Sequence, residues 1–114
     1  MLSDTQMRTI AEKYINFLNQ VEGQKELKLY PLGDELKKTY GSIFPYNTKK
    51  YYNTKNLEDQ VMTTPFLVEK ATGRIVNFGS SDYLELSLSK YEKGTLALSS
   101  DGYWYHETET YSSK

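Results

Sequence analysis

The apolar positions at the start of the chain recur with the period of an α-helix. Ser3 is followed three residues later by Gln6, as in a capping box, and the stripe then predicts a helix over residues 4–21 that closes at Gly23. The stripe consists of Met7, Ile10, Ala11, Tyr14, Ile15, Leu18 and Val21. Polar residues lie mostly off this stripe, so one face of the helix is expected to cover a sheet.

Shorter, strand-like patterns follow. Leu27 and Leu29 alternate within residues 26–31 and predict a strand that ends at Pro31. Residues 39–48 predict a second strand, while residues 35–40 match either one helical turn or the start of a strand. Residues 47–56 are rich in Asn and Lys and predict a surface loop, and residues 57–62 a short helix behind Asn56.

The clearest pattern in the chain is a β-hairpin. Residues 64–70 and 74–79 are strand-like and are joined by Ala71-Thr72-Gly73, a turn that contains glycine. These two strands are expected to be central in the sheet. Their predicted core residues are Phe66, Val68, Ile75 and Phe78.

The last third of the chain predicts a helix and another hairpin. Ser81 or Asp82 is expected to cap a helix that runs to about residue 92, with Gly94 just past its end. Residues 95–99 and 103–109 predict a hairpin around Ser100-Asp101-Gly102, and residues 111–114 a frayed tail. The order of elements predicts one α+β domain over residues 1–114. Its expected architecture is a single antiparallel β-sheet covered by the N-terminal helix, with a second helix near residues 81–92 and a C-terminal hairpin.

Composition narrows the classes of function. The formal net charge is −1, from 14 basic and 15 acidic residues, so no overall field attracts nucleic acid or anionic lipid. The chain has no cysteine, no apolar run of membrane-spanning length, and no leader pattern at Met1. We therefore expect a cytoplasmic protein without disulfides, thiolate chemistry or a membrane partner. Its compositional oddity is 11 tyrosines, whose hydroxyls need partners or water.

Side chains suited to catalysis are sparse. His106 is the only histidine, and its position in a C-terminal strand is typical of a surface or half-buried residue. Neither Glu107 nor Glu109 would share its face of a strand, so no metal motif results. Two carboxylate pairs, Asp82 with Glu85 and Asp34 with Glu35, are available for acid–base work, but capping and turn roles explain them better. We predict no cofactor and no enzyme activity.

Tyrosines outside the core pattern indicate a surface for a partner. Residues 46–55 place Tyr46, Tyr51 and Tyr52 beside lysines such as Lys49, a combination used by single-stranded nucleic acid sites and by protein interfaces. The near-neutral charge favours a protein partner, and a plain solvated loop remains an alternative. The strand from residue 103 adds Tyr103 and Tyr105 on one face; Trp104, on the other, is expected in the core or, alternatively, as an interface anchor.

The middle of the chain resembles the immunity protein 35 family, small bacterial antitoxin-like proteins encoded with polymorphic toxins. The resemblance covers residues 40–91: a Gly-aromatic strand, then Pro-x-x-Val-x-x-x-Thr-Gly-x-Ile, a glycine, and a helix that ends in tyrosine. The matching segments are residues 40–51, residues 65–76, Gly79 and residues 83–91. The sequence departs from the family pattern at Ser42, where tryptophan is usual, and at Thr63-Thr64, where Gly-Asn is usual.

This resemblance implies neutralisation of a cognate toxin by direct binding, with no active site. Two other functions remain open from the residues alone. The chain could inhibit a specific intracellular hydrolase such as a protease, with residues 47–56 or the terminal hairpin in the enzyme cleft. It could also be a module for single-stranded nucleic acid, a partner that the net charge disfavours.

Overall fold

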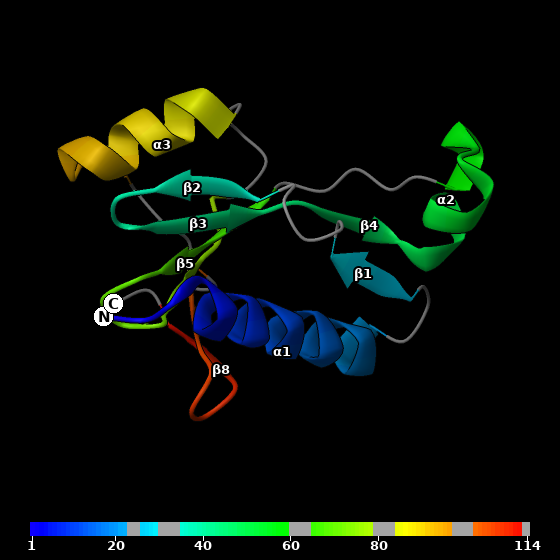
Figure 1. Cartoon of the computed structure of the whole chain (residues 1–114), viewed down its shortest axis with the longest axis horizontal. Helices are drawn as coiled ribbons and strands as arrows, with labels where there is room; N and C mark the ends of the chain where they lie inside the picture. The colour runs from blue at the N-terminus through cyan, green and yellow to red at the C-terminus, as the bar shows by residue number, and fades with distance from the viewer. Residues whose placement is uncertain (23–25, 30–34, 60–64, 79–83, 97–101, 113–114) are drawn as a thin grey trace.

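The fold is built on a six-stranded antiparallel sheet with a helix on each face and a separate two-stranded sheet (Figure 1). The computed structural model describes residues 1–22, 26–29, 35–59, 65–78, 84–96 and 102–112. In chain order its elements are α1 (Asp4–Glu22), β1 (Leu27–Leu29), β2 (Leu36–Lys38), β3 (Gly41–Phe44), β4 (Tyr46–Thr48), α2 (Lys49–Thr54), the 3₁₀-helix η1 (Leu57–Asp59), β5 (Phe66–Glu69), β6 (Ile75–Val76), α3 (Leu84–Lys93), β7 (Tyr103–Tyr105) and β8 (Thr110–Ser112). The predicted α+β class is confirmed.

Helix α1 begins with the predicted capping box. The backbone N–H of Gln6 donates to Ser3 Oγ at 3.1 Å, and the backbone N–H of Ser3 donates to Gln6 Oε1 at 2.8 Å. The predicted stripe is buried as far as Leu18, but Val21 is 66% exposed. Periodicity alone placed Val21 in the core, and that part of the prediction is wrong because a stripe does not show where a helix loses contact with its sheet.

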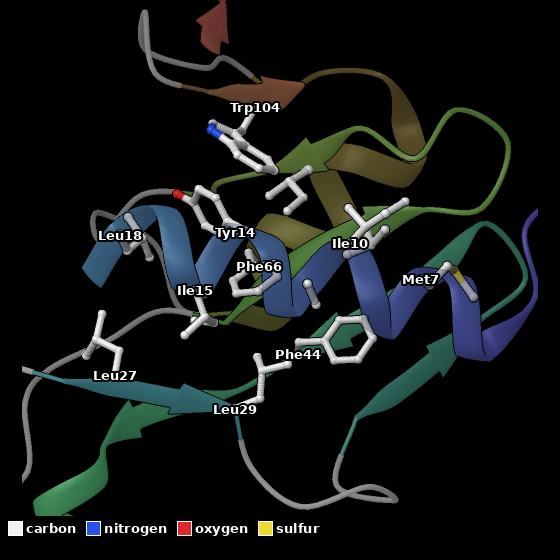
Figure 2. Close-up of a cluster of buried hydrophobic side chains, with 13 residues drawn as sticks. Met7, Ile10, Tyr14, Ile15, Leu18, Leu27, Leu29, Phe44, Phe66 and Trp104 are labelled. Carbon is white, nitrogen blue, oxygen red and sulfur yellow. The ribbon is translucent and has the colours of Figure 1, made fainter. Parts of the chain in front are cut away.

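The first core lies between α1 and one face of the sheet (Figure 2). Tyr14 packs at the centre, with its ring centroid 5.0 Å from those of both Phe66 and Trp104. Trp104 is 0% exposed, which decides that it belongs to the core. Aromatic side chains bury large areas and favour such tilted and edge-to-face contacts, so this cluster contributes strongly to holding α1 on the sheet.

The second core lies on the opposite face, under α3. Ile43, Leu67 and Val76 point to this side and pack with Leu88 of α3 and with Phe78. The predicted core residues are therefore all buried, but they are divided between two faces, since Phe66, Val68 and Ile75 belong to the α1 side. Covering both faces explains why every residue of β3 and β5 is buried.

The predicted central hairpin is confirmed, with Leu67 opposite Val76 and Val68 opposite Ile75. Strand order in the large sheet is β2-β3-β5-β6-β7-β8, while β1 pairs with β4. The prediction of one sheet thus needs correction. In the β3–β5 register Phe44 faces Phe66, so the next positions are Pro45 and Pro65. Because proline has no N–H to donate, the ladder stops there and the chain continues as β4 beside β1.

Several local predictions are corrected. Residues 49–54 form helix α2 where a loop was expected, and residues 36–38 form a strand, the second of the two alternatives. The C-terminal hairpin joins β7 to β8 through residues 106–109, which were expected to continue a strand. Tyr111 pairs with Trp104 and is not frayed. The Asp-Gly turn at Asp101 and the cap at Ser81 or Asp82 lie outside the described residues.

Candidate functional site

The predicted partner-binding residues lie in two separate regions. Tyr46, Lys49, Tyr51 and Tyr52 belong to β4 and α2, whereas Tyr103 and Tyr105 belong to β7. Figure 1 shows α2 at one end of the long axis, well away from α3 and from the hairpin that contains β8. Each region is therefore described by itself.

Helix α2 is fixed in place although none of its residues is buried. At its start, Thr48 Oγ1 accepts a hydrogen bond of 3.1 Å from the backbone N–H of Tyr51. At its end, Lys55 has φ 56°, a left-handed conformation, and its backbone N–H donates to the Tyr51 carbonyl at 2.8 Å. Because caps satisfy backbone groups that a helix end leaves open, they account for a short helix that burial does not stabilise.

Tyr52 connects α2 to the neighbouring two-stranded sheet, and two lysine side chains contact its ring. Its hydroxyl donates to the backbone carbonyl of Leu29 at 3.0 Å. Two ammonium groups lie near its ring: Lys28 Nζ is 5.3 Å and Lys55 Nζ 5.1 Å from the ring centroid. We call Lys28, Lys49, Lys50, Tyr52 and Lys55 the lysine–tyrosine patch. Sequence reasoning missed Lys28, because only the pairing of β1 with β4 brings it beside α2.

The other predicted residues of this region have partners within the fold. Tyr46 packs on the first core, with its ring centroid 5.6 Å from that of Phe66. Lys49 pairs with Glu26 at 3.2 Å, and both side chains are at least half exposed. Tyr51 is half-buried. Tyr46 is thus largely a packing residue, while Lys49 remains available at the surface.

The outer edge of β1 is occupied by side chains. Asn19 of α1 accepts from the Leu27 N–H at 2.8 Å and donates to the Leu27 carbonyl at 3.2 Å. The Tyr52 hydroxyl donates to the Leu29 carbonyl on the same edge. In an antiparallel pair, alternate residues direct both backbone groups away from their partner strand. Asn19 and Tyr52 therefore occupy backbone groups with which an added strand would pair.

A polar groove of about 360 Å³ runs between α1 and β1. Its lining includes Arg8, Glu12 and Asn16 of α1, with Glu26, Lys28 and Lys49 across from them. Its lining carries charges of both signs, and Arg8 already lies within 3.6 Å of Glu12 and 3.8 Å of Glu35. The groove therefore selects no particular ligand charge.

Tyr103 and Tyr105 belong to a cluster organised by a partly buried ion pair. Arg74 binds the Glu69 carboxylate through two hydrogen bonds, Nε to Oε1 at 2.7 Å and Nη2 to Oε2 at 3.0 Å. Its guanidinium carbon lies 3.8 Å from the Tyr103 ring centroid, and Arg74 also hydrogen-bonds Tyr105. These two tyrosines are half-buried, and their contacts with Arg74 give them a role in the fold.

The same ion pair joins the central hairpin to α3. Thr72 donates to Glu69 Oε1 at 2.8 Å, and the Tyr91 hydroxyl of α3 donates to Oε2. Burial tends to raise the pKa of the Glu69 carboxyl, but the hydrogen bonds from Arg74, Tyr91 and Thr72 outweigh it and hold that pKa below its ordinary value. Burial and the bond to Glu69 raise the pKa of Tyr91. Glu69 is therefore a fully occupied structural carboxylate.

Of the candidates for catalysis, only His106 gains a carboxylate partner among the described residues, because residues 106–109 form a turn and not the expected strand, which brings Glu107 beside it. His106 Nε2 lies 2.6 Å from Glu107 Oε1, in an exposed turn, and the His106 carbonyl accepts from Lys13 Nζ at 2.6 Å. Asp34 and Asp82 lie outside the described residues, so neither predicted carboxylate pair is tested. In the described ranges no group of three or more His, Cys, Asp or Glu side chains is placed to hold a metal ion.

Comparison with known proteins adds no relative: no family model, curated protein or solved structure matches the chain. Within the part of the chain that the structure describes, no helix is long and apolar enough to cross a membrane. Among the described surfaces, the lysine–tyrosine patch is the candidate functional site that combines fixed geometry, exposure and an excess of one charge.

Proposed function

We propose that this chain is a binding protein that neutralises a protein partner by direct contact, without catalysis of its own. Following the resemblance to the immunity protein 35 family, the proposed partner is a cognate bacterial toxin, met in the cytoplasm of the cell that makes this chain. The lysine–tyrosine patch is the proposed contact surface, and the β7 tyrosines Tyr103 and Tyr105 are a second, separate one.

One observation carries the proposal. Helix α2 buries none of its residues, yet two caps close its ends and the bond from Tyr52 to the Leu29 carbonyl ties it to β1. A surface element that adds little to the core but is held rigidly loses little conformational entropy on binding, which favours affinity for a partner. The neighbouring Leu57, at 74% exposure, adds apolar area at the same end of the molecule.

Co-expression tests the proposal. A secreted toxin encoded beside this gene is expressed in a host, alone and together with this chain, and growth is measured alongside complex formation between the two purified proteins by calorimetry. Neutralisation predicts restored growth and a tight complex. Growth arrest in the presence of a folded chain that forms no complex would contradict the proposal. If the neighbouring gene encodes a protease, loss of peptide hydrolysis in the complex would identify hydrolase inhibition.

A further inference from the structure

We infer that the lysine–tyrosine patch binds an acidic surface of a partner protein. In this complex, carboxylates of the partner bind the ammonium groups of Lys28 and Lys55, the two lysines that contact the Tyr52 ring. The inference rests on the proposed function in that the partner is a protein. It adds the chemistry by which this partner is recognised and a residue, Lys28, that lies outside the α2 segment.

The first argument is the local balance of charge. By sequence, residues 26–29 and 46–59 contain four positive residues, Lys28, Lys49, Lys50 and Lys55, and three negative ones, Glu26, Glu58 and Asp59. The local balance is thus positive in a chain whose net charge is −1, and Glu26 is already paired with Lys49. At physiological salt the interaction between exposed charges is screened over a Debye length of about 8 Å. The patch therefore attracts an acidic surface in direct contact with it much more strongly than a distant polyanion.

The second argument is the state of two of these ammonium groups. Lys49 pairs with Glu26, whereas neither Lys28 nor Lys55 forms an ion pair with any described residue. Both lie near the Tyr52 ring, a contact that contributes only about 0.5–1 kcal/mol at exposed sites. An ammonium has three donors, and a ring contact leaves donors free for an incoming carboxylate. The ring thus contacts two cations without neutralising them.

The third argument separates a protein partner from nucleic acid. Single-stranded nucleic acid stacks its bases on open aromatic faces. Here Lys28 and Lys55 lie over the Tyr52 ring, Tyr46 packs against Phe66, and Tyr51 is half-buried, so the described rings offer no row of open faces on which successive bases could stack. Carboxylates need the ammonium groups and not the ring face. The geometry therefore favours an acidic protein surface.

The test uses the full chain, labelled with ¹⁵N and titrated with a hexaglutamate peptide while its amide signals are recorded by NMR. The patch variant is Lys28→Ser with Lys55→Asn, because asparagine tolerates the left-handed backbone of that position. The matched control is Lys38→Ser with Lys93→Asn, which removes the same charge from exposed lysines of β2 and α3. Thermal unfolding of all three proteins verifies that each is folded.

We expect peptide-induced shifts at Lys28 and across α2, and a peptide affinity that is roughly three- to tenfold weaker in the patch variant, as removal of two exposed charge contacts predicts. The control should bind like the wild type. Equal losses in both variants, shifts centred elsewhere, or tighter binding of an oligothymidine of equal charge at the same residues would overturn the inference.

The same variants separate this inference from the proposed function. If the toxin is neutralised and the patch variant binds it as tightly as the wild type, the function stands and the acidic contact is wrong. If no toxin is neutralised but the peptide maps to the lysine–tyrosine patch, the contact chemistry stands and the proposed function fails.

Discussion

Replacing Arg74 by methionine is expected to destabilise the fold, because it leaves the Glu69 carboxylate buried without its cation. The Glu69 side chain is 9% exposed and loses two charge-assisted hydrogen bonds, of 2.7 and 3.0 Å. Removing one partner of a buried ion pair costs about 3–5 kcal/mol. Arg74 is 25% exposed, and Thr72 and Tyr91 still donate to the carboxylate. We therefore expect the free energy of unfolding to fall by about 2–3 kcal/mol.

The loss should depend on pH in a defined direction. The folded-state pKa of Glu69 lies below its ordinary value, which is about 4.3 in an unfolded chain. Its contribution to stability is thus fully present above that pH and is lost as the pH falls through the folded pKa. The difference in unfolding free energy between wild type and Arg74→Met should be largest near neutral pH and shrink below about pH 4.

Urea denaturation followed by circular dichroism measures both effects. The double variant Glu69→Leu with Arg74→Met removes the stranded charge, so it should be more stable than the sum of the two single losses predicts. Lys37→Met, which breaks the exposed pair with Asp4, serves as the control and should change stability little. Additive losses in the double variant, or a pH-independent loss in Arg74→Met, would refute the assignment of Glu69 and Arg74 as a coupled pair.

Three further predictions concern the core and the lone histidine. Ile10→Asp should unfold the protein, since Ile10 is 7% exposed and an unpaired charge would be buried, and a melting curve like that of wild type would contradict its place in the core. Gly41→Ala places a Cβ too close to the Val68 carbonyl oxygen, so the free energy of unfolding should fall by roughly 2 kcal/mol or more. Calorimetry measures this change, and an unchanged unfolding temperature would argue against the contact between β3 and β5 at this position. His106→Ala should leave partner binding and neutralisation intact; loss of neutralisation with unchanged affinity would point to a catalytic role.

The sequence by itself determined the elements whose signals are local. The capping box of Ser3 and Gln6 and the stripe that follows it predict α1, and the Thr-Gly turn at Gly73 predicts the central hairpin. Gly94, at φ 72°, stands where the second helix was expected to end. Each signal comes from residues a few positions apart, whose preferences act before any distant contact forms.

Only the tertiary structure decided which surfaces exist. The composition of residues 47–56 indicates a loop, yet Thr48, Lys55 and the bond from Tyr52 to the distant Leu29 make six of its residues a helix. Likewise, β1 must pair with β4 before Lys28 reaches the Tyr52 ring. The two caps are local, but the bond from Tyr52 to Leu29 joins residues 23 positions apart, and no periodicity within a window records this bond or the β1–β4 pairing. The fold class therefore follows from local patterns, whereas the candidate site follows from long-range packing.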